Sequence, residues 1–305
     1  MLFPWKKKKQ QATAETESGP GETLDFSQFQ PPIIECAGKS HTGMVRKVNE
    51  DQFLIADLHK NMQIQSSSEP FQNARMVGET MGKLMVVADG IGGSHAGEIA
   101  SQMAIQSMAQ YLLNSMHWLY HPKQPEIEQF VEDLKQAALR SHEVIRTDAQ
   151  QDPNHQGMGT TLTVAYLLWP MLYVLHIGDS RCYILREGKL QLLTKDQTLA
   201  QHLHDCGHLK SDEFEQSPYH NILLSAIGSE DGPNAVVYRT RLLAGDRIML
   251  CSDGVNKHLE DADIEFILSS DRTVEEICQQ LIESTNMLGG KDNITAVVAK
   301  TTAKV

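Results

Sequence analysis

Short apolar runs separated by turn residues dominate the chain from residue 52 onward. Runs such as 52–56 and 84–88 are of the buried-strand type. Two further pairs of runs flank the short breaks 169–171 and 187–189, and this arrangement is typical of β-hairpins. We therefore expect strands over residues 52–56, 84–88, 160–168, 172–177, 182–186, 190–193, 235–241, 247–251 and 294–299.

Three longer segments have the spacing of helices. Residues 97–116 and 126–148 carry apolar side chains at intervals of three and four residues, and 273–288 does the same. Thr273 and Glu276 form a capping-box pattern at the start of the last segment. Strands outnumber helices and several join through short turns, which favours antiparallel sheets with helices packed outside over a parallel sheet.

The domain organisation follows from composition along the chain. Residues 1–31 lack apolar periodicity and are expected to be a disordered arm, with one folded domain over 32–305. Within that domain, 57–83 is a polar insertion between two expected strands. The segment 198–222 is rich in His, Asp and Glu and is expected to be a mobile flap, whose histidines are either a metal-sensing cluster or solvated loop residues.

Composition narrows the function. The chain has 305 residues, of which 41% are hydrophobic, so it can bury a large core. A net charge of −12 repels nucleic acid. Five cysteines without a CxxC pair argue against a disulfide framework or a zinc knuckle and favour a reducing, cytoplasmic setting. No apolar run reaches about 18 residues, so we expect no transmembrane helix.

One local pattern recurs four times along the chain. In each case an apolar strand run ends at, or begins after, an aspartate beside a small or turn residue. Strand ends are where a rigid sheet presents side chains to a shared cleft, and an acidic pair also precedes the strand at 52–56. The residues are Asp89 (with Gly90), Asp179, Asp253 and Asp292, and the pair is Glu50-Asp51.

Clustered carboxylates raise one another's pKa unless cations neutralise them. Mg²⁺ and Mn²⁺ prefer such all-oxygen sites, and no His/Cys cluster competes for the role. Two such ions can activate a bridging water and hold a phosphate. A single Asp-Gly after a strand is usually only a turn, so the prediction requires that these aspartates converge in space.

Taken together, the motifs resemble the type 2C (PPM) protein phosphatases, and the bacterial subtype fits best. The resemblance covers about 35–300 and its blocks occur in family order. The blocks are His41-Thr-Gly-Met-Val-Arg46-Lys-Val-Asn-Glu50-Asp51, Val87-Ala-Asp89-Gly90-Ile-Gly92-Gly93, Gly97-Glu98-Ile-Ala-Ser101, Gly157-Met-Gly-Thr160-Thr161-Leu-Thr163, Gly178-Asp179-Ser180-Arg181, Cys251-Ser252-Asp253-Gly254 and Lys291-Asp292-Asn293-Ile-Thr295.

The resemblance implies a four-layer αββα sandwich, in the α+β class, with two Mn²⁺ or Mg²⁺ ions at one edge and a third ion at a weaker site. The first metal site would use Asp89, Asp253 and Asp292. The second would use Asp89, the Gly90 carbonyl and Glu50-Asp51, and the third Asp179 and Asp253. Among these ligands, Asp89 and Asp253 would be central to catalysis.

Other roles are carried over from the same resemblance. Arg46 would grip the substrate phosphate, unless it only forms a surface salt bridge. Asn293 would orient Asp292 or a water on the metal. Ile91 stands where many eukaryotic members carry a histidine proposed as general acid, so the proton donor is a metal-bound water, solvent, His41 or His95.

The sequence therefore predicts a protein-serine/threonine phosphatase in which a water bridging two ions attacks phosphorus. Its partners would be phosphorylated proteins, substrates of a serine/threonine kinase. One alternative is a narrow regulatory phosphatase acting on a phosphorylated anti-sigma-antagonist type of partner. The other is an inactive module that binds phosphoproteins, which the retained metal-ligand set disfavours.

Overall fold

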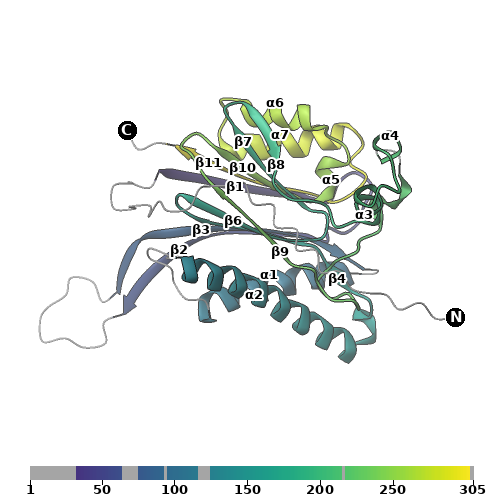
Figure 1. Ribbon diagram of the computed structural model, residues 1–305, viewed down its shortest axis with the longest axis horizontal. Coiled ribbons are helices and arrows are strands. Elements are labelled where there is room, and N and C mark those ends of the chain that lie inside the picture. The colour runs from purple at the N-terminus through teal and green to yellow at the C-terminus, as the bar shows by residue number, and fades with distance from the viewer. Residues whose placement is uncertain (1–31, 64–74, 93–94, 116–123, 215–216, 303–305) are drawn as a thin grey trace, which may run out of the picture. The chain divides into compact units, whose positions relative to one another are not determined.

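Two antiparallel sheets lie face to face at the centre of the protein, with helices on their outer faces (Figure 1). The computed structural model describes residues 32–63, 75–92, 95–115, 124–214 and 217–302. The expected α+β sandwich of four layers is confirmed. The predicted arm at 1–31 lies outside the described residues.

The first sheet is built around a C-terminal strand rich in β-branched residues. Its five strands run in the order β1-β11-β10-β7-β8, and each neighbouring pair is antiparallel. The hairpin predicted across residues 187–189 is present as β7 and β8, with Lys189 already in the second strand. The strands are β1 (Ile33–His41), β7 (Arg181–Arg186), β8 (Lys189–Leu192), β10 (Arg247–Cys251) and β11 (Ile294–Thr302).

The second sheet has the order β2-β3-β5-β6-β9, with β4 paired to β3. Its central hairpin, β5 and β6, pairs Leu162 with Ile177 through Leu168 with Met171, as the sequence predicts. The strands are β2 (Asp51–Gln63), β3 (Arg75–Ile91), β4 (Gly159–Thr160), β5 (Leu162–Leu168), β6 (Met171–Ile177) and β9 (Val236–Arg241).

Helices cover the outer face of each sheet because each buries one apolar stripe. α1 (Ala96–Ser115) and α2 (Gln124–Gln151) pack on the second sheet, whereas α6 (Asp261–Ser269) and α7 (Val274–Met287) pack on the first. The predicted capping box of α7 is present in both directions between Thr273 and Glu276. None of the described helices has the length and apolar character needed to cross a membrane.

A third apolar cluster fills the space between the sheets. Met85 and Val87 from β3 meet Leu250 of β10 and Val297 of β11 in this layer. Each Å² of buried apolar surface contributes about 25 cal/mol of stabilisation, so this contact is a main source of attraction between the layers. The sheets therefore hold their strand ends in fixed relative positions, which matters for the aspartates described below.

Two segments that the sequence left unassigned contain regular structure. β2 and β3 continue beyond the expected strands and pair as far as Gln63 with Arg75, with register shifts near His59. The predicted flap holds α3 (Leu199–Asp205), which Thr198 caps, as well as α4 (Ser211–Phe214) and the 3₁₀ turn η3 (Pro218–Asn221). The remaining short elements are η2 (Pro153–His155) and α5 (Asp253–Asn256).

Candidate metal centre

The predicted aspartates of the second sheet lie directly opposite each other. β2 begins at Asp51, and Asp51 is the register partner of Asp89 near the end of β3. The pairing brings an acidic residue from each strand to the same edge of the sheet. The register matters, because a slip of one position would turn one of these side chains to the other face of the sheet.

The first sheet contributes its aspartates at the same edge. Asp253 comes two positions after the end of β10, and Asp292 comes two positions before the start of β11. β10 and β11 are antiparallel neighbours, with Cys251 opposite Ala296. Asp179 lies between β6 and β7, where the chain crosses from the second sheet to the first. The centre is therefore assembled from strand ends of both layers.

The electrostatics show that these carboxylates are close to one another. Burial, with the charges of Asp253 and Asp292, raises the pKa of Asp51 to about 7, although Ser252 and Thr295 lower it. Burial and the charge of Asp51 raise the pKa of Asp89 well above its usual range. Burial and Asp253 do the same to the pKa of Asp179. Such mutual repulsion indicates a site short of positive charge.

Hydrogen bonds with serine and threonine hydroxyl groups hold the acidic residues of the centre in place. Ser252 Oγ donates to Asp51 Oδ2 at 2.6 Å and accepts from the backbone N–H of Thr295 at 3.0 Å. The backbone N–H of Asp89 donates to Thr161 Oγ1, which is itself 2.8 Å from Ser180 Oγ. None of these side chains has a role predicted from the sequence, although Ser252, Thr161 and Ser180 each belong to a motif block.

Asn293 fixes the loop that carries the acidic pair. Its Oδ1 accepts from the backbone N–H of Glu50 at 2.8 Å, and its Nδ2 donates to the carbonyls of Thr42 and Val48 at 2.9 Å. Its backbone N–H donates to Asp292 Oδ1 at 2.9 Å. Asn293 thus positions Asp292 through its backbone N–H. Its side-chain amide holds the loop of residues 42–50 together through the three hydrogen bonds given above.

Glu50 and Gly90 make a close backbone contact beside α1. The backbone N–H of Gly90 donates to the Glu50 carbonyl at 3.2 Å, which also accepts from Ser101 Oγ at 2.6 Å. A Cβ atom at position 90 would lie 2.2 Å from the Gly97 carbonyl oxygen, so the approach requires glycine. Burial raises the pKa of Glu50, and Arg46 partly offsets this.

Two basic side chains already neutralise part of the centre. Arg46 Nη2 lies 2.9 Å from Asp292 Oδ2, with the arginine side chain 50% exposed. Lys257 is ion-paired with Asp253 Oδ2. Burial lowers the pKa of Lys257, but the charge and hydrogen bond of Asp253 and the charges of Asp179 and Asp292 together outweigh it, and the net pKa is raised. Arg46 therefore forms a salt bridge with Asp292, and its phosphate role stays a prediction.

The donor set fits Mn²⁺ or Mg²⁺, which prefer oxygen ligands. Asp51 Oδ1 and Asp253 Oδ1 are buried and have no hydrogen-bond partner, which is costly unless another group satisfies them. Among the residues that the structure describes, no three His, Cys, Asp or Glu side chains are grouped closely enough to hold one ion. Arg46 and Lys257 hold one oxygen of Asp292 and one of Asp253 instead.

Four of the described histidines make local contacts. His41 Nδ1 accepts from the Gly43 backbone N–H at 2.9 Å, and His95 Nδ1 lies 3.2 Å from Glu98. In the flap, the rings of His204 and His220 both pack on Phe214, with centroids 4.9 and 4.7 Å away. The proton donor, whether a metal-bound water, solvent, His41 or His95, stays a prediction.

Comparison with known proteins identifies the class. The sequence profile of the family "Protein phosphatase 2C" matches residues 65–296. The chain belongs to this family, as the resemblance predicts.

The relatives are bacterial. The chain is 34% identical over 268 residues to the serine/threonine protein phosphatase PstP of Mycobacterium tuberculosis, covering 88% of this chain and 45% of PstP. The chain thus spans less than half the length of that relative. It is 32% identical to the serine/threonine phosphatase stp of Listeria innocua, covering 71% of this chain and 84% of the relative.

A solved structure shows the same fold. The catalytic domain of PstP, crystallised in complex with two manganese ions, superposes with a TM-score of 0.68 at 30% identity. The match covers 88% of this chain and 98% of that structure. The αββα arrangement is therefore shared over nearly all of the PstP catalytic domain.

Proposed function

We propose that this chain is a protein-serine/threonine phosphatase that hydrolyses phosphoserine and phosphothreonine in other proteins with two Mn²⁺ or Mg²⁺ ions. The observation that carries the proposal is the mutual repulsion of aspartates from both sheets, two of which have a buried carboxylate oxygen without a hydrogen-bond partner. Membership of the protein phosphatase 2C family and the two manganese ions of the PstP catalytic domain support it.

The residues that would hold the ions all lie at this edge. When bound, a pair of divalent ions supplies an activated water for in-line attack on phosphorus and neutralises phosphate charge. The protein keeps the acidic groups in place through Ser252 and Asn293. The proposed ligands of this pair are Glu50, Asp51, Asp89, the Gly90 carbonyl, Asp253 and Asp292, whereas Asp179 with Asp253 matches the weaker third position.

Arg46 would bind the substrate phosphate. Its side chain is half exposed and its guanidinium is paired with Asp292, so it is accessible from solvent beside a proposed ligand. Neutralisation of Asp292 by another cation would weaken this pair and leave the guanidinium free for a phosphate group. A planar guanidinium can donate two parallel hydrogen bonds to phosphate oxygens.

The test is a Mn²⁺-dependent assay with p-nitrophenyl phosphate and a phosphothreonine peptide, with EDTA and Asp89→Asn as controls. We expect hydrolysis of both substrates by the wild type and its loss in both controls. A folded wild type that hydrolyses neither substrate with Mn²⁺ would contradict the proposal. Peptide binding without hydrolysis would instead support the phosphoprotein-binding module.

A further inference from the structure

Lys257 is placed by helix geometry directly beside a proposed metal ligand. α5 begins at Asp253, and Lys257 follows four residues later, so the two side chains share one face. The backbone N–H of Lys257 donates to the Asp253 carbonyl at 2.9 Å, which fixes the turn. The ammonium group then pairs with Asp253 Oδ2, while 33% of the lysine side chain stays exposed.

The ammonium group acts on more than one carboxylate. Lys257 stands within Coulombic reach of Asp179 and Asp292 as well as of its partner Asp253. Asp179 and Asp253 lie on different connections, one between β6 and β7 and the other after β10. Lys257 therefore supplies a fixed positive charge where these two aspartates meet.

The two oxygens of Asp253 have different surroundings. Oδ1 is buried and has no hydrogen-bond partner, whereas Oδ2 is taken by the ammonium group. The free oxygen faces no competing donor, so it is the one available to a metal ion. The other oxygen, which could serve a further ion together with Asp179, is occupied by the protein's own cation.

We propose that Lys257 is a tethered cation that takes the place of a divalent ion between Asp179 and Asp253, and so limits the centre to two ions. The inference rests on the proposed function, since it assumes that the remaining aspartates bind metal. A divalent ion entering between these aspartates would meet a like charge and lose one oxygen of Asp253 as a ligand. Lys257 is thus a specificity-determining residue for metal number.

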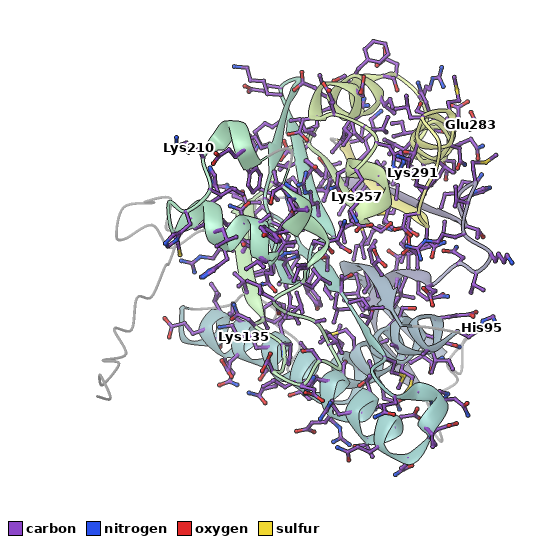
Figure 2. All side chains as sticks on the ribbon, turned by 90° about the vertical axis from the view of Figure 1, so that its right-hand side faces the viewer. His95, Lys135, Lys210, Lys257, Glu283 and Lys291 are labelled. Carbon is purple, nitrogen blue, oxygen red and sulfur yellow. The ribbon has the colours of Figure 1, made fainter. Side chains whose placement is uncertain are left out.

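The experiment counts Mn²⁺ ions by isothermal titration calorimetry and by electron paramagnetic resonance of free Mn²⁺. Lys257→Met removes the charge and keeps an unbranched stem, and Lys257→Arg keeps the charge. Lys291→Met and Lys135→Met are charge-matched controls, one beside Asp292 in sequence and one on α2. Figure 2 labels all three lysines.

We expect two ions in the wild type, in Lys257→Arg and in both controls. Lys257→Met should bind a third ion at least tenfold more tightly than the wild type does, about 1.4 kcal/mol. Adding Asp179→Asn to Lys257→Met should remove that ion again.

Equal stoichiometry and affinities in wild type and Lys257→Met would overturn the inference. A wild type that binds a third ion which Asp179→Asn removes would do so too, and this result needs no folded Lys257 variant. A wild type that binds no Mn²⁺ would refute the proposed function itself, together with the inference. The two failures are therefore distinguishable.

Discussion

His176 should make the stability of the fold sensitive to mild acid. The side chain lies fully buried on β6, with Nδ1 3.1 Å from Thr163 Oγ1 and Nε2 3.1 Å from the Lys195 carbonyl oxygen. A carbonyl only accepts, so Nε2 carries the proton of the neutral ring. Burial lowers the pKa of His176 from 6.5 to about 4, although Asp196 raises it and Arg181 lowers it further.

The sign follows from proton counting. Between pH 6.5 and about 4 the unfolded chain holds a proton on His176 that the folded chain does not. The free energy of unfolding therefore decreases as the pH falls through this range. The contribution of the neutral His176 ring to folding stability is fully present above pH 6.5. Each pKa unit corresponds to about 1.36 kcal/mol, so the full loss is about 3 kcal/mol and about 2 kcal/mol is lost by pH 5.

The measurement is urea unfolding in EDTA at pH 7.5, 6 and 5 for wild type, His176→Gln and the control His208→Gln, which alters an exposed histidine. The raised pKa values of Asp51 and Asp89 have the opposite effect, because protonation of these two carboxylates makes the folded protein more stable as the pH falls. The comparison of variants is therefore decisive, rather than the wild-type profile. His176→Gln should lose about 2 kcal/mol less than the other two proteins; parallel profiles for all three would refute the reasoning.

Four further predictions concern the candidate site. Asp89→Asn should lower kcat at least a hundredfold, about 2.7 kcal/mol of barrier, and weaken Mn²⁺ binding in calorimetry; more than a tenth of wild-type kcat would contradict it. Arg46→Ala should mainly raise KM, with Arg46→Lys restoring only part, and unchanged kinetics would remove Arg46 from the site. Ser252→Ala leaves a carboxylate oxygen of Asp51 unpaired, so urea unfolding should show a loss of about 1–3 kcal/mol, and Ser252→Thr less. Ile91→His should raise kcat for a phosphopeptide more than for p-nitrophenyl phosphate, and an equal effect on both would contradict water as the donor.

The sequence predicts the parts of this fold that local patterns determine. The hairpins, the three long helices and the aspartates at strand ends follow from periodicity and turn residues alone. α6 was not predicted, because its capping box begins with Glu260 and not with the usual Ser or Thr. The extended pairing of β2 and β3 was not predicted either, since polar strand residues carry little apolar alternation.

The candidate site was predictable in its residues but not in their partners. Asp89 and Asp253 stand in recognisable motifs, whereas the bond from Ser252 to Asp51 joins residues 201 positions apart. Such contacts depend on how the two sheets pack, which no local pattern encodes. Lys257 is different, because its spacing of four from Asp253 was visible and could have been read as a helical ion pair.

The position of the centre across both sheets has a consequence for how the protein unfolds. Asp51 and Asp89 belong to one layer and Asp253 and Asp292 to the other, so a shared ion would cross-link the layers much as a disulfide would, but reversibly. Free ligand at 100 times its Kd adds about 2.7 kcal/mol to folding stability. Melting temperature would then report metal availability, and a chelator would act as a mild denaturant aimed at the contact between the sheets.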